Sequence, residues 1–166
     1  MLEPEPPRAT RIPFPATAAG RELWMGGTAS LLGEPLYPRI LAGTLVVDCA
    51  GELPPVWQRA AGLYLPCVFS DLDATPAQLA RLEHLAQQLA ETLRGGSALV
   101  NGGIARVCVL CQVGMNRSGL LVGLTLRVLG AGGEEAIAVI RRARPGALSN
   151  ETFARLIRAW QPFCPR

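Results

Sequence analysis

The sequence predicts an α/β fold in which a central, mostly parallel sheet of four to five strands is flanked by helices. The chain has 166 residues, of which 49% are hydrophobic, and its mean hydropathy is +0.25, which suits one compact domain with a sizeable core. The segment Thr44–Cys49 is apolar nearly throughout, as strands of parallel sheets are. A short strand, a loop and an apolar helix follow one another between residues 105 and 128, which is typical of such a fold.

The N-terminal part of the chain differs in texture from the rest. Residues 1–20 are rich in proline and show little hydrophobic periodicity, so we expect an extended arm that lies on the domain or is left mobile. Residues 21–166 are expected to form the single domain. Its first predicted strand includes Leu23–Met25, and a later one is Tyr64–Val68, where Pro66 favours a sheet edge or a strand end.

The clearest helix begins at Thr75-Pro76, an N-cap residue followed by a first-turn proline. Leucines then recur at spacings of three and four until Gly95-Gly96 ends the pattern. His84, the single histidine, lies one residue off this stripe, so we expect it to be solvated rather than catalytic. Residues 97–103 resemble an insertion.

The C-terminal half contains the strand–loop–helix unit and further helices. Ala105–Leu110 is a predicted strand, and Gly119–Val128 and Gly133–Ile137 lie in predicted helices. A basic run follows at a helix end, and we expect it to form a solvated face rather than a substrate-docking patch; it consists of Arg141, Arg142 and Arg144.

The inventory of polar residues excludes several mechanisms. All 16 basic residues are Arg, so no lysine is present for a phosphate-binding P-loop, a Schiff base or a Ser-Lys pair. One histidine cannot build a multi-histidine metal site, and we predict neither a metal nor a cofactor. Catalysis must therefore use cysteine, arginine, the backbone and few carboxylates, among which the aspartates are Asp48, Asp71 and Asp73.

Charge and cysteine usage bound the partners and the compartment. A net charge of +3, scattered along the chain, argues against nucleic acid as the partner. No apolar run approaches the ~18 residues that a membrane helix needs. The five cysteines include no CxxC pair and no secretion signal precedes them, so we expect free thiols and a cytoplasmic, monomeric protein.

The segment Cys111–Ser118 carries the candidate chemistry, because it joins the strand ending at Leu110 to an apolar helix. Successive loop amides and the positive end of the helix dipole can hold an oxyanion. The predicted phosphate-binding residues are Gln112, Val113, Gly114, Met115, Asn116 and Arg117. A guanidinium such as that of Arg117 can grip two phosphate oxygens at once.

The same field favours the thiolate form of Cys111, which could attack a bound phosphorus and form a phosphocysteine. Ser118 is placed to donate its hydroxyl to the sulfur and so to help the thiolate leave. The alternative interpretation is a buried Cys111 that ends a core strand, with Arg117 on the surface.

This constellation resembles the C-x5-R-S/T signature loop of the cysteine-based protein tyrosine phosphatases, in particular their small dual-specificity branch. The resemblance spans residues 22–163. It implies that Cys111 is the nucleophile, Arg117 the phosphate clamp and Ser118 the hydroxyl that assists thiolate release. The family usually has His directly before the cysteine, whereas this chain has Leu110, so a hydrogen-bonding support is missing and we expect a less acidic activity optimum.

The resemblance also implies an aspartic general acid on a loop before the long helix. Asp71 and Asp73 both lie there, and we favour Asp71 because of its reach from the strand end. Asp73 can instead interact with the helix start, and Asp48 is expected to accept hydrogen bonds from neighbouring loops. The residues 97–103 would account for the long spacing between this acid and Cys111.

The predicted function is therefore a metal-independent phosphatase that acts on phosphotyrosine, and on phosphoserine or phosphothreonine, in proteins. An inactive phospho-binding module is the alternative, and sulfur or arsenate chemistry on the same anion site is a third interpretation. Cys49 is either a core residue or a redox partner that forms a disulfide with Cys111 under oxidants.

Overall fold

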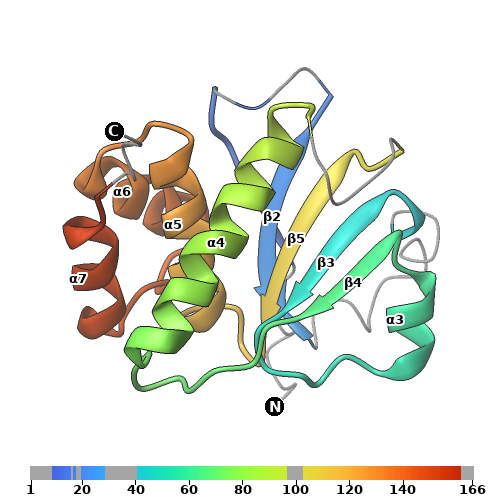
Figure 1. Ribbon diagram of the computed structural model, residues 1–166, viewed down its shortest axis with the longest axis horizontal. Helices are drawn as coiled ribbons and strands as arrows, with labels where there is room; N and C mark the ends of the chain where they lie inside the picture. The colour runs from blue at the N-terminus through green and yellow to red at the C-terminus, as the bar shows by residue number, and fades with distance from the viewer. Residues whose placement is uncertain (1–8, 16, 18–19, 29–40, 97–102, 162–166) are drawn as a thin grey trace, which may run out of the picture.

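The computed structural model describes residues 9–15, 17, 20–28, 41–96 and 103–161. These residues contain a five-stranded sheet with the strand order β1-β2-β5-β3-β4 (Figure 1). Strands β2, β5, β3 and β4 run parallel, and β1 is antiparallel to β2. The predicted α/β fold with a mostly parallel sheet is confirmed. In chain order the strands are β1 (Thr10–Ile12), β2 (Glu22–Gly27), β3 (Thr44–Asp48), β4 (Leu63–Pro66) and β5 (Arg106–Cys111).

In the described part of the chain, more helices cover one face of the sheet than the other (Figure 1). Four of them pack on one face, namely α4 (Pro76–Leu93), α5 (Arg117–Val128), α6 (Gly133–Ala143) and α7 (Glu151–Ala159), whereas the short α3 (Pro55–Ala60) lies on the other. Side chains of β5 alternate accordingly: Val109 and Cys111 join the main core under the four helices, and Cys108 and Leu110 join a smaller cluster that includes Trp57 of α3. Cys111 thus points to the face that α5 covers.

Three elements differ from the sequence prediction: β1, α3 and α7, for the last of which the sequence analysis predicts no helix. Strand β1 lies inside the segment expected to be an arm, and it pairs with β2 from Thr10↔Met25 to Ile12↔Leu23. Ile12 is buried in the main core, so this part of residues 1–20 belongs to the sheet. Helix α3 is not predicted by the sequence pattern, because its six residues are too few for periodicity and none of them is buried.

The remaining boundaries agree with the prediction to within two residues. Strand β4 ends at Pro66 on the edge of the sheet, where a missing N–H removes no ladder bond. Strand β5 extends to Cys111, and α5 begins at Arg117 instead of Gly119, so the loop between them is shorter than the sequence indicates. The predicted insertion at 97–103 lies outside the described residues except for Gly103.

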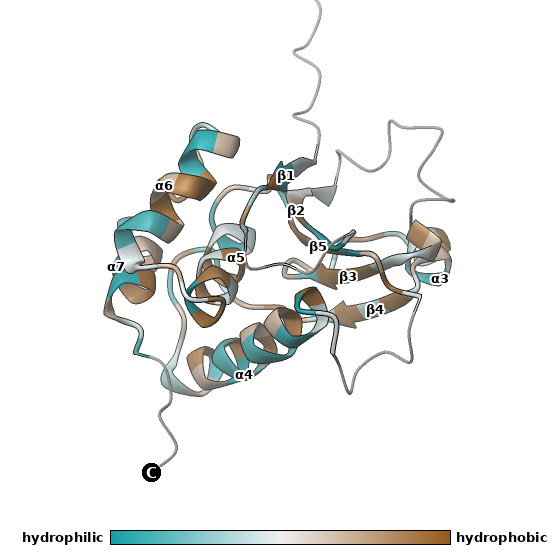
Figure 2. Cartoon of the chain, turned by 90° about the horizontal axis from the view of Figure 1, so that it is seen from above, coloured by the Kyte–Doolittle hydropathy of each residue, from teal (hydrophilic) through white to brown (hydrophobic). Residues whose placement is uncertain are grey.

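Helix α4 forms as its sequence indicates. The Thr75 hydroxyl accepts a hydrogen bond from the Gln78 N–H, and the Gln78 side chain accepts one from the Thr75 N–H, which completes a capping box. Leu82, Leu85, Leu89 and Leu93 of the stripe are buried and Leu79 is partly buried, whereas His84 is exposed, as predicted. Figure 2 shows hydrophobic and hydrophilic residues alternating along α4, as a helix half-covered by protein requires. No helix in the described part of the chain is both long and apolar enough to cross a membrane.

Candidate active site

Cys111 is the last residue of β5, and its thiol sits beneath the loop that leads to α5. Its side chain is 3% exposed. The Gly114 N–H donates a hydrogen bond to the Cys111 Sγ at 3.2 Å, and the Ser118 Oγ lies 3.3 Å from the same sulfur. A backbone amide, a hydroxyl and the N-terminus of α5 therefore converge on one sulfur atom, which stabilises negative charge there.

Glycines make the close approach between this loop and β2 feasible. Gly114 has φ +78°, and a Cβ on it would lie 2.2 Å from the backbone carbon of Gly26. A Cβ on Gly27 would lie 2.8 Å from the Gln112 carbonyl oxygen. The Gly-Gly ending of β2 thus exists because the loop lies directly over it, and Gly114 is required both by conformation and by space.

Arg117 is the first residue of α5 and lies at the pocket wall. Its Nε is buried and has no hydrogen-bond partner among the described residues. Asp71 forms an ion pair with it, because the Asp71 Oδ1 lies 3.7 Å from that Nε. A buried guanidinium nitrogen without a hydrogen bond is unfavourable by itself, so its position fits a site that receives an anion.

A pocket of about 190 Å³ opens above the Cys111 thiol. Gly114 and Ser118 are buried beneath it, against the sulfur. The predicted phosphate-binding side chains other than Gly114 line it. The complete lining consists of Asp71, Cys111, Gln112, Val113, Met115, Asn116, Arg117 and Ser149.

The three aspartates have distinct surroundings. Asp71 lines the pocket, and 55% of its side chain is exposed. Asp73 is exposed as well, but its Oδ1 accepts a hydrogen bond from the Ala74 N–H and it does not line the pocket. Asp48 is buried, and its carboxylate accepts hydrogen bonds from backbone amides and from the Tyr64 hydroxyl at 2.8 Å. The geometry therefore brings Asp71, and not Asp73, to the candidate nucleophile.

The connection between α6 and α7 supports the loop from behind, which no pattern in the sequence indicates. Arg144 was expected on a solvated face, but it is 3% exposed. Its guanidinium donates to the carbonyl oxygens of Gly114 at 2.6 Å and Val113 at 3.2 Å, and to the Thr10 hydroxyl at 2.9 Å. Burial lowers the pKa of Arg144, which the nearby Cys111 counteracts. Because the carbonyls of Val113 and Gly114 point toward Arg144, the amide between them, the Gly114 N–H, faces the Cys111 sulfur.

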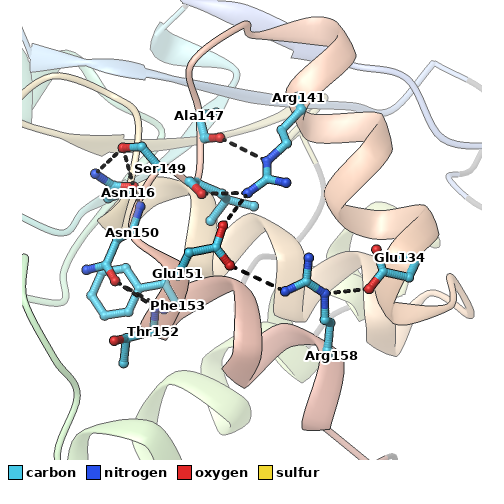
Figure 3. Close-up of polar contacts among 11 residues, drawn as sticks. Asn116, Glu134, Arg141, Ala147, Ser149, Asn150, Glu151, Thr152, Phe153 and Arg158 are labelled. Carbon is cyan, nitrogen blue, oxygen red and sulfur yellow. Dashed lines mark hydrogen bonds and ion pairs between the residues drawn. The ribbon is translucent and has the colours of Figure 1, made fainter.

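Further contacts from the same connection hold the rest of the loop. The Leu148 N–H donates to the Met115 carbonyl at 3.0 Å, and Leu148 adopts a left-handed φ of 57°. The Asn150 N–H donates to the Asn116 Oδ1 at 2.9 Å. Arg141 in turn donates to the carbonyls of Ala147 and Leu148 (Figure 3). The basic run thus divides: Arg141 and Arg144 bind backbone, and only its middle member, Arg142, is exposed.

Leu110 occupies the position directly before Cys111, where the signature usually has His. It is fully buried in the smaller cluster with Leu53 and Cys108, so its side chain offers no hydrogen bond to the loop. A hydrogen bond comes instead from Thr28, the residue directly after β2, whose buried hydroxyl donates to the Cys111 carbonyl at 3.3 Å. No residue pattern in the sequence points to this contact, since Thr28 and Cys111 are 83 positions apart.

Three cysteines lie at the carboxyl ends of three neighbouring strands: Cys111 ends β5, Cys49 follows β3 and Cys67 follows β4. The Cys49 N–H donates to the Leu110 carbonyl at 2.7 Å, and the register Asp48↔Leu110 places Cys49 next to Cys111. Cys67 follows β4 in the same way on the other side of Cys49. Burial, followed by the neighbouring Cys67, Cys111 and Asp48, raises the pKa of Cys49 well above its usual value. The four described cysteines are free thiols.

The described residues contain no group of three or more His, Cys, Asp and Glu side chains arranged to hold a metal ion. The groups gathered at the site are the Cys111 thiol, the Arg117 guanidinium, the loop amides and the Asp71 carboxyl group.

We compared the sequence and the structure with those of known proteins. No family model matches the sequence, and no curated protein matches it significantly. Solved structures do match. A mouse protein described as a dual specificity phosphatase, solved with zinc tungstate, is 25% identical, with 95% of this chain and 87% of that chain covered and a TM-score of 0.63.

Two further structures agree with it. Human DUSP28 is 22% identical, with 94% of each chain covered and a TM-score of 0.61. Kinase associated phosphatase, solved with its catalytic cysteine replaced by serine, is 14% identical, with 93% of this chain and 94% of that chain covered and a TM-score of 0.68. The chain therefore has the fold of the dual-specificity branch of the cysteine-based protein tyrosine phosphatases, as the sequence resemblance predicts.

Proposed function

We propose that the protein hydrolyses phosphate monoesters on proteins, as a tyrosine or dual-specificity phosphatase that uses a phosphocysteine and no metal. One observation carries the proposal: the Cys111 sulfur, held by the Gly114 amide and the Ser118 hydroxyl, lies at the base of a pocket walled by Arg117. The shared fold with proteins described as phosphatases supports it.

In the first step, the Cys111 thiolate attacks the phosphorus of the bound monoester. The S–P bond forms as the bond from phosphorus to the leaving oxygen breaks. Arg117 and the loop amides stabilise the charge on the non-bridging phosphate oxygens. Protonated Asp71, on the pocket wall, gives its proton to the leaving oxygen, which departs as an alcohol or phenol.

In the second step, water attacks the phosphocysteine. Asp71, now a carboxylate, accepts a proton from that water, and the S–P bond breaks to release phosphate. The Ser118 hydroxyl donates a hydrogen bond to the departing sulfur, from which it lies 3.3 Å in the resting site. The thiolate is thereby regenerated without any other reagent.

The lining supports a substrate with a single phosphate group. The ionisable side chains around the pocket are those of Arg117, Asp71 and Cys111. The other side chains that line the pocket are uncharged. A polyphosphorylated ligand would find no second cation in this lining. Phosphotyrosine, phosphoserine and phosphothreonine in proteins fit that description.

Hydrolysis of para-nitrophenyl phosphate tests the proposal. Wild type should turn over, Cys111→Ser should abolish turnover, and Arg117→Lys should lower kcat/KM by about 10²-fold or more because one bidentate contact is lost. Arg142→Lys is the matched control, since Arg142 is exposed and away from the pocket. Absence of turnover together with Arg117-dependent phosphopeptide binding would instead identify a phospho-binding module.

We further propose that the enzyme is a cytoplasmic monomer. We also propose that Cys49 protects the nucleophile, Cys111, from oxidation. Hydrogen peroxide converts the Cys111 thiolate to a sulfenic acid and releases hydroxide. The Cys49 thiol then attacks that sulfur, the S–O bond breaks, and a disulfide and water result. The register supports this step, because Cys49 and Cys111 directly follow the paired residues Asp48 and Leu110, and neighbouring strands lie roughly 4.8 Å apart, within the range of Cα separations in disulfides.

A further inference from the structure

Asn150 connects three parts of the molecule that the sequence keeps far apart. Its side-chain Nδ2 donates to the Asp71 carbonyl at 2.8 Å and to the Leu72 carbonyl at 3.3 Å. Its backbone N–H donates to the Asn116 Oδ1 in the phosphate loop. Its Oδ1 accepts from the first turn of α7, as Figure 3 shows. One residue thus joins the loop of the candidate acid, the phosphate loop and a helix N-terminus.

The loop that carries Asp71 needs such an anchor. The Leu72 side chain is 81% exposed and that of Asp71 is 55% exposed, so little hydrophobic packing fixes this stretch. The Ser70 hydroxyl accepts from the Leu72 N–H, a bond within the loop itself. Arg81 of α4 holds the beginning of the loop through the Val68 carbonyl. The contact from Asn150 is made at Asp71 itself.

We propose that Asn150 is the positioning residue for the general acid: its amide holds the Asp71 backbone so that the carboxyl group stays over the pocket beside Arg117. This inference rests on the proposed function, in which Asp71 protonates the leaving oxygen. General acid catalysis requires hydrogen-bond reach, so a displacement of ~1 Å is enough to weaken it. Loss of the anchor lowers the fraction of molecules in which Asp71 is in place.

The nitrogen and the oxygen of the Asn150 amide have separate roles, so the hydrogen bonds to the Asp71 loop can be removed without removing the cap of α7. Asn150→Ser keeps a side-chain oxygen that can cap α7 but lacks the Nδ2 donor, and Ser and Asn are about equally good N-cap residues. Asn150→Asp also keeps the cap and removes the donor, so it serves as a second variant if the first folds poorly. Arg155→Gln is the matched control, because Arg155 is an exposed residue of the same helix and does not line the pocket.

The experiment compares two aryl phosphates. Phenyl phosphate has a basic leaving group that needs a proton, whereas a fluorinated coumarin phosphate has an acidic leaving group that departs without one. Asn150→Ser should lower kcat/KM for phenyl phosphate by about tenfold or more, within the roughly 10²–10⁴-fold contribution of a general acid. It should change kcat/KM for the coumarin substrate less than about twofold, and Arg155→Gln should change neither substrate's value.

Asp71→Asn should show the same dependence on leaving group, and Asn150→Ser in that background should cause no further loss. Equal losses of kcat/KM on both substrates, or a full additional loss in the double variant, would show that Asn150 has a merely structural role. Either result would overturn the proposal that Asn150 positions Asp71. No leaving-group effect in Asp71→Asn would overturn it too, together with the assignment of the acid. Activity that survives Cys111→Ser would instead refute the phosphocysteine mechanism, which is a separate outcome.

Discussion

Replacing Arg144 by Met tests whether the connection between α6 and α7 supports the phosphate loop. The substitution removes hydrogen bonds to Gly114, Val113 and Thr10 and leaves an apolar chain in the same buried space. Hydrogen bonds from a charged donor contribute roughly 1.5–3 kcal/mol each. Relief from burying a guanidinium offsets part of that loss, so we expect the free energy of unfolding to fall by about 2–4 kcal/mol.

Urea denaturation followed by tryptophan fluorescence measures that change. Arg142→Met is the control: it lies two positions away in the same basic run but is exposed, so its effect should stay within about 0.5 kcal/mol. The inhibition constant of inorganic phosphate should also rise for Arg144→Met, because the loop amides lose their fixed direction. Equal stabilities of the two variants, with unchanged phosphate inhibition, would refute the reasoning.

Three further outcomes are expected. Gly114→Ala should nearly abolish phosphate binding and activity, because its Cβ would overlap the end of β2 and φ is +78°; isothermal titration with phosphate checks this, and unchanged affinity would contradict it. Burial and the hydrogen bond to Asp48 raise the pKa of Tyr64 to about 12, so this bond stabilises the fold below pH ~10 and is lost as pH rises toward 12. Tyr64→Phe should therefore lower the free energy of unfolding by about 1–2 kcal/mol at pH 8, and this difference from wild type should shrink above pH 10 in urea titrations. A difference that stays constant with pH would contradict this assignment of the hydrogen bond. Mild peroxide should link Cys49 to Cys111, and Cys49→Ser should lose reversibility of inactivation by thiols; mass spectrometry that finds Cys111 sulfinate and no link in wild type would remove the redox proposal.

The fold could be predicted largely from local pattern. Helix α4 has its capping residues and its leucine stripe in one continuous segment, and β3 is apolar enough to identify a buried strand. Strand β1 escaped prediction because three residues among prolines carry no periodic signal, and it forms only because β2 offers it an edge. Its stability is a property of the tertiary structure.

The candidate site also has a part that the sequence predicts and a part that depends on tertiary contacts. Cys111, Arg117 and Ser118 lie within one short motif, so their convergence follows from the strand–loop–helix connection alone. The supports of that motif could not be read from the sequence, because Thr28 and Arg144 reach the loop from distant elements. Arg144 in particular resembles its exposed neighbour Arg142 in sequence, and only the packing of α6 separates their roles.

The central claim is that Cys111 carries the phosphoryl group during turnover. Rapid acid quenching of the enzyme with a phosphotyrosine peptide, followed by mass spectrometry of proteolytic fragments, tests it directly. The account predicts one phosphoryl group on the fragment containing Cys111, more of it in Asp71→Asn because hydrolysis of the intermediate slows, and none in Cys111→Ser. Continued turnover with no phosphoryl group on Cys111 at any quench time, or a phosphoryl group on another residue, would contradict it.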